Sequence, residues 1–383
     1  MARVAAIAAN VTPKKTTRPI LSHVLLQCAA QNGGKPEVLR VTANDEEITY
    51  QTHIDVDGEV EGEITVPAKD FASITSAMPN EPLMLEWLLN TPAAEVEITS
   101  AKRRCEFSLP TLPAQDFPDT DHPSDVPFFL YRAADLLRLL DHVAYAASSD
   151  EARYYLCGVH VEIANGKPLR FVATDGHRLS LVEGEVVEGY KADLPNTFTI
   201  PRRVLTEIRR AFDPKGGPIG FYPTDKRIFF EQGRQCFSSL LIEGVFPDYQ
   251  QVIPQKPTFS LRVSKTDLLQ SLRRISLMSP ESTMGLIFQV TGGDFVVYSR
   301  SSGRGQAKEQ IKVHEGEGEV EIGFNAQYFI DALSSLSPAH EFVNLRFSNS
   351  LTPCLVEPVA LEKEQADKQA AKSASFVIMP MRF

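Results

Sequence analysis

A strand followed by a helix recurs three times in the pattern of apolar and polar positions along the chain. The three copies lie at 63–71, 197–205 and 321–329, and their strands end at Val66, Ile200 and Phe324. These ends are 134 and 124 residues apart. Pro67 and Pro201 follow two of the strands, where the first turn of a helix tolerates a missing N–H, and Asn325 is a favourable N-cap after the third. The pattern therefore predicts a repeated strand–helix unit.

Two further pairs of similar segments recur at nearly the same spacing. Phe-Pro-Asp triplets at 117–119 and 246–248 each follow a short Phe-Ser strand and are 129 residues apart. The segment Val41–Asp45 also resembles Val172–Asp175. Strand–helix units look alike in many α+β proteins. Three sets of similar segments recur here, however, at spacings close to one third of the 383 residues, which favours internal repetition. We expect boundaries in the Pro-containing stretches after the triplets, which gives domains 1–125, 126–253 and 254–383.

Each repeat is mostly strand. In the middle repeat, alternating or β-branched and aromatic runs predict strands at 161–163, 169–173, 197–200 and 227–231. Apolar positions at helical spacing predict helices at 133–147 and 201–212. The expected fold is α+β, with three similar domains of antiparallel sheets and two helices each.

Positive charge is concentrated on two predicted helices. In the helix at 201–212, Arg202, Arg203, Arg209 and Arg210 lie opposite Val204, Leu205, Ile208, Ala211 and Phe212. The helix at 264–277, which begins with a capping-box-like Ser264-x-x-Asp267, places Lys265, Arg273 and Arg274 opposite its leucines. Acidic residues alternate instead along 59–63 and 315–321, which predicts acidic strand faces. The helix at 326–336 has no basic residue.

The composition is that of an ordinary globular chain, with 43% hydrophobic and 23% charged residues and a net charge of −10. No apolar run reaches the roughly 20 residues that a membrane-spanning helix needs, and residues 1–12 do not resemble a secretory signal. Five scattered cysteines without a CxxC pair argue against a zinc site or disulfide framework and fit a reducing cytoplasm. Arg-rich helix faces without a base-reading motif favour contact with phosphate backbones, despite the acidic total.

The most enzyme-like segment is Ala173–Leu179. Asp175 and His177 are imaginable as a base and its orienting group, or as two metal ligands. The chain lacks GxxxxGK[ST], GxSxG, HExxH and GxGxxG motifs and has no second cluster of His, Asp and Cys to complete a centre. A tight turn stabilised by an Asx-type bond, with His177 beside it, is the favoured interpretation. We expect no catalytic residues, no cofactor and no metal.

The chain ends on the apolar segment Phe376–Phe383. Its first part fits a last strand buried in the third sheet. Met379 and Met381 around a proline form an adaptable apolar surface, of the kind that accepts varied apolar peptides.

Five segments together carry a family resemblance. Arg153–Gly158, Ala173–Leu179, Phe246–Tyr249, Glu321–Asn325 and Val377–Phe383 resemble the bacterial β sliding clamps, the processivity subunits of DNA polymerase III. The similarity runs in order from about Pro19 to the last residue. It implies a head-to-tail dimeric ring of three-domain subunits around duplex DNA, with helices lining the pore. It also implies a non-catalytic cytoplasmic protein that tethers the polymerase catalytic subunit, other polymerases and repair proteins, and is loaded by a separate ATPase.

The resemblance also suggests site residues. A cleft for short apolar partner peptides would use Leu156, Thr174, Gly176, His177, Arg178, Leu179, Pro247, Val252, Leu351, Val377, Ile378, Met379, Pro380 and Met381. DNA contact would fall to Lys15, Tyr154 and Tyr155, joined by Arg202, Arg203, Arg209, Arg210, Arg273 and Arg274 from the helix faces. The ring interface would pair Phe107 and Leu109 of one subunit with Leu277 and Met278 of the other.

The chain departs from the family pattern in four places. It starts inside a helix that the family precedes with a strand, so we expect either a start set too far downstream or a short first domain. Pro353 replaces a small polar cleft residue, Gln251 replaces a basic one, and 357–375 is a longer stretch expected to form a solvated loop or short helix. A short first domain would be compatible with an alternative hypothesis, in which the protein is a clamp paralogue that binds partner peptides without closing a ring. A hydrolase centred on Asp175 and His177 is the weaker alternative.

Overall fold

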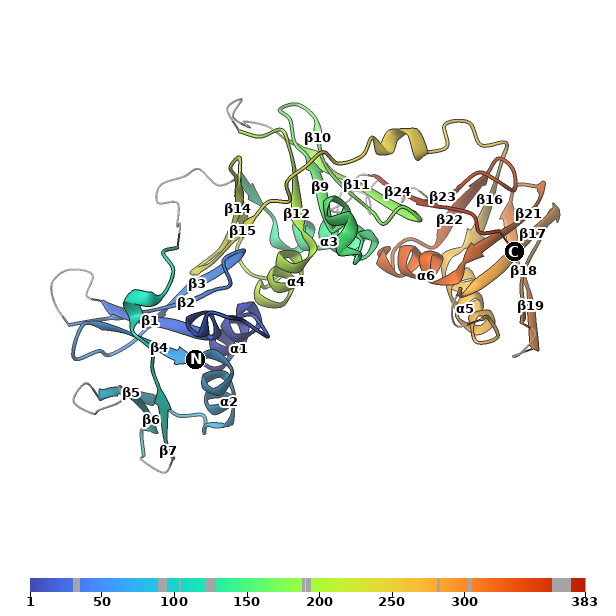
Figure 1. Ribbon diagram of the computed structural model, residues 1–383. Helices are drawn as coiled ribbons and strands as arrows, with labels where there is room; N and C mark the ends of the chain where they lie inside the picture. The colour runs from blue at the N-terminus through green and yellow to red at the C-terminus, as the bar shows by residue number, and fades with distance from the viewer. Residues whose placement is uncertain are drawn as a thin grey trace. The chain divides into compact units, whose positions relative to one another are not determined.

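The computed structural model describes residues 1–29, 35–88, 95–102, 105–120, 129–187, 190, 194–280, 283–301, 305–359 and 373–382. The chain forms two compact units, one from 1–133 with 203–241 and the other from 134–202 with 242–383. Each unit contains one large and one small sheet (Figure 1). All strand pairs among the described residues are antiparallel, as expected.

The first unit holds sheets of eight and three strands. In spatial order the larger sheet contains β4 (Gly62–Pro67), β1 (His23–Ala29), β2 (Val38–Asn44), β3 (Ile48–Asp55), β15 (Gln235–Leu240), β14 (Arg227–Gln232), β13 (Ile219–Pro223) and β8 (Phe129–Tyr131). The smaller contains β5 (Leu83–Leu88), β6 (Glu95–Ser100) and β7 (Glu106–Pro110). Helices α1 (Ala2–Val11) and α2 (Ala68–Ala77) pack side by side, and most of α4 (Arg202–Ala211) belongs to this unit.

The second unit holds sheets of nine and four strands. In spatial order the larger sheet contains β12 (Thr197–Pro201), β9 (Gly158–Glu162), β10 (Pro168–Thr174), β11 (Arg178–Val186), β24 (Ser373–Ile378), β23 (Cys354–Pro358), β22 (Phe342–Phe347), β16 (Phe259–Ser264) and β20 (Val313–Glu315). The smaller contains β19 (Gly305–Ile311), β18 (Asp294–Ser301), β17 (Gly285–Gly292) and β21 (Gly318–Asn325). Its helices are α3 (Ala133–Val143), α5 (Lys265–Ser276) and α6 (Ala326–Ser335), of which α5 and α6 pack together (Figure 1).

The repeated strand–helix unit is confirmed as β4–α2, β12–α4 and β21–α6. The strand ends Val66, Ile200 and Phe324 are all buried, at 0%, 2% and 0% exposure. Asn325 caps α6, because its Oδ1 accepts a hydrogen bond from the N–H of Gln327 at 2.8 Å. The described residues contain six α-helices, two for each third of the chain, so the predicted three-domain α+β fold is confirmed.

The two large sheets each continue from one predicted domain into the next. Tyr50 of β3 lies opposite Phe237 of β15, with ring centroids 4.8 Å apart, and Leu179 of β11 lies opposite Val377 of β24. The range 126–253 therefore gives β8 and β13–β15 to one unit and β9–β12 to the other. Because these units follow the strand pairing, they do not test the two predicted domain boundaries, which stay a prediction.

Two sequence predictions hold only in part. The helix expected to reach 147 ends at Val143 and continues as the 3-10 turn η3 (Ala144–Ala146). Glu319 and Glu321 share the exposed face of β21, but Glu315 lies in β20 and Glu317 lies between the two strands, so the four glutamates do not share one face. Most of the stretch 357–375 falls outside the described residues.

Candidate DNA-contact and partner-binding surfaces

Helix α4 buries one face and exposes arginines on the other, as its sequence predicts. Arg202, Arg203, Arg209 and Arg210 are exposed, while Val204, Leu205, Ile208, Ala211 and Phe212 are at most 3% exposed. Arg203 and Arg210 already have acidic partners. Arg203 pairs with Asp45, and Arg210 pairs with the buried Glu207 at 2.8 Å. Because each pair offsets part of a positive charge, α4 is less positive than its sequence suggests.

Helix α5 begins as predicted, with Ser264 accepting a hydrogen bond from the N–H of Asp267. Arg273 and Arg274 are exposed near its end, where Arg274 pairs with Glu309 of β19 and Arg273 contacts the Ser334 hydroxyl. The prediction for Lys265 is wrong, since it is only 7% exposed and its Nζ donates to the Ser337 carbonyl at 2.8 Å. Lys265 precedes Leu272 by seven residues, so at about 100° per residue the two lie about 20° apart around the helix, and both belong to its buried face.

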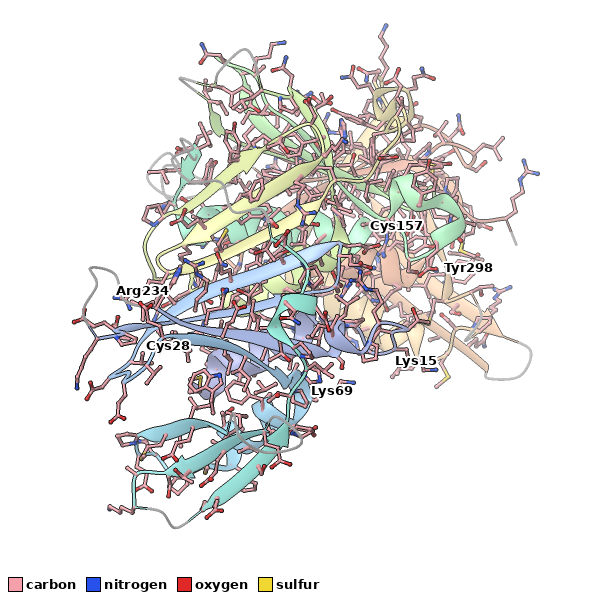
Figure 2. The ribbon with its side chains drawn as sticks, turned by 60° about the vertical axis from the view of Figure 1, so that its left-hand side comes forward. Lys15, Cys28, Lys69, Cys157, Arg234 and Tyr298 are labelled. Atoms are coloured by element: carbon pink, nitrogen blue, oxygen red, sulfur yellow. The ribbon has the colours of Figure 1, made fainter. Side chains whose placement is uncertain are left out.

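The remaining predicted DNA contacts differ in exposure. Lys15 is exposed in the segment that follows α1 (Figure 2). Tyr154 is 57% exposed in the 3-10 helix η4 (Glu151–Leu156), and its ring meets Tyr155 edge-on at 5.8 Å. Tyr155 instead packs against a buried apolar cluster. Of the two tyrosines, Tyr154 presents the larger surface to a ligand in solvent.

The segment after β10 is the predicted Asx turn. The Asp175 Oδ1 accepts hydrogen bonds from the N–H groups of His177 and Arg178 at 2.9 and 3.0 Å. Gly176 adopts a φ of +87°, a conformation that favours glycine. The other carboxylate oxygen of Asp175 accepts from Arg178, and the exposed His177 ring stacks on Tyr328 with centroids 6.4 Å apart. Asp175 therefore orders the turn and does not orient the His177 ring, which removes the geometric basis of the hydrolase alternative.

Arg178 connects this turn to α6. Its Nε donates to Asp175 at 3.0 Å, its Nη2 donates to the Tyr145 carbonyl at 2.9 Å, and its Nη1 pairs with Asp331. The guanidinium also lies over the rings of Tyr145 and Tyr328, 5.2 and 4.8 Å from their centroids. Burial lowers the pKa of Arg178, but the bond to Asp331 and the nearby carboxylates raise it overall. The Arg178 side chain is therefore bonded to groups of its own chain. These bonds hold in place the turn that contains the predicted cleft residues Gly176 and His177.

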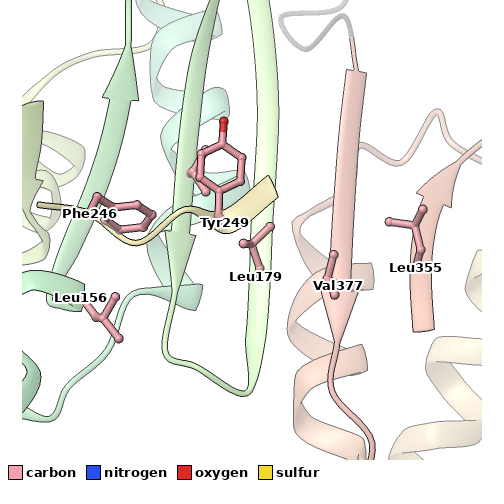
Figure 3. Close-up of a cluster of buried hydrophobic side chains, with 7 residues drawn as sticks. Leu156, Leu179, Phe246, Tyr249, Leu355 and Val377 are labelled. Carbon is pink, nitrogen blue, oxygen red and sulfur yellow. The ribbon is translucent and has the colours of Figure 1, made fainter. Parts of the chain in front are cut away.

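A buried apolar cluster brings together three of the predicted cleft residues (Figure 3). Leu156, Leu179 and Val377 pack with Val172, Phe246, Tyr249 and Leu355, all at most 9% exposed. Sequence reasoning missed the last four. The recurring Phe-Pro-Asp triplet was the available signal for Phe246, and the alternation along β10 was the signal for Val172.

The end of the chain runs from this cluster to β21. Ile378 is 1% exposed and occupies the face of β24 opposite to that of Val377, so it belongs to the core. Met379, Pro380 and Met381 are half-buried. The Met379 N–H donates to the His177 carbonyl at 2.9 Å, and the Met381 N–H donates to that of Gly323 at 2.7 Å. The tail is therefore held at both methionines, with both side chains partly accessible.

Three predicted cleft residues lie more openly. Val252 is 39% and Leu351 is 71% exposed, and Pro247 is also exposed. Thr174 instead supports the turn, since its hydroxyl donates to the Arg178 carbonyl at 2.6 Å and accepts from the Gly176 N–H.

The four predicted interface residues also differ in burial. Phe107 on the edge strand β7 is 40% exposed, whereas Leu109 on the same strand is 7% exposed. Leu277 and Met278, directly after α5, are 69% and 39% exposed. Phe107, Leu277 and Met278 thus expose apolar surface, while Leu109 is buried within its own sheet.

No group of metal-binding side chains occurs among the described residues, and no described helix is long and apolar enough to cross a membrane. All five cysteines are free. The repeated strand–helix unit, the sheets continued between repeats and the exposed arginines of α4 and α5 together define a protein of the DNA clamp class.

Comparisons with known proteins agree with this class. Models of the N-terminal, central and C-terminal domains of the DNA polymerase III beta subunit match residues 1–121, 132–248 and 250–382. The beta sliding clamp of Pseudomonas aeruginosa is 30% identical over 381 residues, covering 98% of this chain and 96% of that protein. The chain belongs to the DNA polymerase III beta subunit family, the bacterial sliding clamps, which are non-catalytic processivity subunits.

Solved structures give the same result. The DNA polymerase III subunit beta of Pseudomonas aeruginosa has a TM-score of 0.86 at 28% identity, covering all of this chain and 97% of that one. The Bartonella birtlesii sliding clamp bound to griselimycin has a TM-score of 0.87 at 26% identity, with the same coverage.

Proposed function

We propose that this chain forms a homodimeric ring that closes around duplex DNA without sequence specificity. The observation that carries the proposal is the match to sliding clamps along nearly the whole chain, from residue 1 to residue 382. Phe107 of one subunit would meet Leu277 and Met278 of the other, with Leu109 supporting β7 from within. The domains of each subunit would be 1–125, 126–253 and 254–383, and the protein would act in the cytoplasm.

DNA contact would be made by positively charged and aromatic side chains without reading bases. The candidates are Lys15, Tyr154, Arg202, Arg203, Arg209, Arg210, Arg273 and Arg274, with Tyr155 behind Tyr154. Such contacts to phosphates fix no sequence and weaken with salt, which suits a ring that slides. The pairs of Arg203, Arg210 and Arg274 with carboxylates lower the net attraction, and a weakly held ring slides more easily.

Partner proteins would bind at the surface above the buried cluster that contains Leu156, Leu179 and Val377. The exposed Val252 and Leu351 and the half-buried Met379 and Met381 supply apolar area for short peptides. The partners would be the catalytic subunit of DNA polymerase III, the clamp-loading ATPase, other polymerases and repair proteins. Tethering converts their rebinding to DNA into a local event at high effective concentration.

Topological retention on DNA tests the proposal. The protein is loaded with a clamp-loading ATPase onto a nicked circular plasmid, and the bound fraction is isolated by gel filtration. A closed ring stays on the circle at high salt and leaves when a restriction enzyme linearises the DNA. Retention on linear DNA would indicate ordinary binding instead, and no retention on the circle would favour the paralogue that does not close a ring.

A further inference from the structure

One face of the nine-stranded sheet is apolar at one end and polar at the other. Side chains two residues apart on a strand share a face, so Arg170 and Val172 of β10 point the same way. Arg170 lies opposite Glu162 of β9 and Glu183 of β11, while Val172 lies opposite Leu181. The polar end thus begins one pair of residues away from the apolar cluster.

The polar end is a connected hydrogen-bond network. Arg170 donates to Glu183 through Nε at 3.0 Å and Nη2 at 2.7 Å, and to Glu162 through Nη1 at 2.9 Å. Ser373 of β24 donates to the second oxygen of Glu183 at 2.8 Å. Burial lowers the pKa of Arg170, but the hydrogen bonds to Glu183 and Tyr249 raise it overall.

Tyr249 belongs to both ends of this face. Its ring is part of the apolar cluster, and the side chain is 6% exposed. Its hydroxyl donates to Glu162 at 2.7 Å and accepts from Arg170 at 3.3 Å. In Figure 3 the ring lies beside Leu179, and the hydroxyl points away from Leu179 and Leu156. Tyr249 comes from the segment between β15 and β16, so these two bonds fasten that segment to the sheet.

Phe246 provides a second anchor for the same segment. Its ring stacks on His160 with centroids 4.6 Å apart and planes at 7°, and it meets Tyr249 edge-on at 6.4 Å. Pro247 lies between the two anchors, and Val252 ends the 3-10 helix η5 (Tyr249–Val252) that starts at Tyr249. Both are exposed. The two exposed positions are thus carried by two buried aromatic side chains.

We infer that Tyr249 is a positioning residue for partner binding, whose hydroxyl, held by Glu162 and Arg170, places Pro247 and Val252 against an apolar ligand. The inference rests on the proposed partner surface and deepens it. Arg170 and Glu162 act through Tyr249 and do not touch the ligand. Glu162 is partly exposed, so water can replace its bond to the Tyr249 hydroxyl when that hydroxyl is removed. The loss should therefore make the segment 246–252 less ordered without unfolding the protein.

The test uses the full chain and griselimycin, the compound bound in a structure of a related clamp. Tyr249→Phe keeps the ring and removes only the hydroxyl. We expect affinity for griselimycin to fall about 3- to 10-fold, mostly through faster dissociation, as the loss of one hydrogen bond implies. Hydrogen exchange at the amides of 249–253 should quicken while the melting temperature stays within a degree or two.

Matched variants separate positioning from general damage. Tyr50→Phe removes a comparable tyrosine hydroxyl bond, to Gln235 at 3.2 Å in the first unit, and should leave griselimycin affinity unchanged. Glu162→Gln keeps an acceptor for the Tyr249 hydroxyl and should bind nearly as well as the unmodified chain, whereas Glu162→Ala should resemble Tyr249→Phe. Equal affinities for Tyr249→Phe and the unmodified chain would overturn the inference.

A variant with Met379→Ala and Met381→Ala distinguishes this failure from failure of the partner surface itself. If the double variant loses affinity while Tyr249→Phe does not, the surface stands and the positioning role is wrong. If the unmodified chain does not bind griselimycin, or if neither the double variant nor Tyr249→Phe loses affinity, both the surface and the inference are wrong.

Discussion

Asp45 and Asp175 occupy the same position in two copies of one turn. Each Oδ1 accepts hydrogen bonds from two following N–H groups, those of Glu47 and Ile48 in the first copy and of His177 and Arg178 in the second. The residue after each aspartate has a positive φ, +77° at Glu46 and +87° at Gly176. The resemblance of Val41–Asp45 to Val172–Asp175 is thus a repeated backbone structure.

This comparison predicts that Glu46→Gly stabilises the protein. A side chain at positive φ costs about 1–2 kcal/mol, whereas the exposed pair of Glu46 with Arg18 contributes less than about 1 kcal/mol. We expect the free energy of unfolding to rise by about 0.5–1 kcal/mol in urea titrations. Glu46→Ala loses the same pair but keeps a Cβ, so it should not stabilise. If alanine and glycine behave alike, backbone strain at this position is not the cause.

Substitution of the two terminal methionines should weaken partner binding. Met379→Ala together with Met381→Ala removes apolar area that peptides would cover, and we expect about tenfold weaker binding or more. Anisotropy of a labelled short peptide containing Leu and Phe measures the affinity. Met78→Ala, at the end of α2 in the first unit, is the control and should bind normally. An unchanged affinity in the double variant, with the fold retained, would remove the tail from the binding surface.

Removal of Arg209 and Arg210 should reduce the salt dependence of DNA binding. Each phosphate contact contributes about 0.9 to the slope of log K against log salt, so the double Ser variant should lower it by up to about 2. Arg210 is expected to contribute less because Glu207 already pairs with it. Arg234→Ser, in the turn between β14 and β15 (Figure 2), should leave the slope unchanged. An equal slope in the double variant would place α4 away from DNA.

The sequence predicts features that depend on spacing. The helical period of 3.6 residues assigns Val204 and Ile208 to the buried face of α4 and Arg209 to its exposed face, without knowledge of the fold. The turn at Asp175 follows equally from local chemistry, because its hydrogen bonds reach only two and three residues along the chain.

The sequence does not predict features that depend on contacts between residues far apart along the chain. The pair of Arg203 with Asp45 joins residues 158 apart, and Tyr249 meets Glu162 from 87 residues away. Nothing local indicates that these charges and hydroxyls have partners. Lys265 is a different case, because its position on the helical wheel, about 20° from Leu272, already indicates the buried face.

Acid should destabilise the second unit through His142. Burial first, and then the charges of His340 and Arg138, lowers its pKa to about 4. The unfolded chain takes up a proton near pH 6.5, so stability is full above that pH and falls as the pH drops toward 4, by about 2 kcal/mol at pH 5. His142→Leu should reduce the difference between urea unfolding at pH 7.5 and pH 5 by about this amount. If His142→Leu leaves this difference in unfolding free energy unchanged, groups other than His142 cause the loss of stability in acid.

We expect ring closure to depend on the apolar surface that Phe107 and Leu277 expose. A homodimer has twice the 42.5 kDa of the chain, about 85 kDa, and light scattering across a dilution series should give this mass. Phe107→Ser and Leu277→Ser together should return it to 42.5 kDa, because they remove exposed apolar side chains that the proposed interface would bury. Leu130→Ser, at 64% exposure on β8, removes a similar side chain elsewhere and should leave the dimer intact. A mass of 42.5 kDa for the unmodified chain at every concentration would contradict the ring and favour the paralogue that does not close.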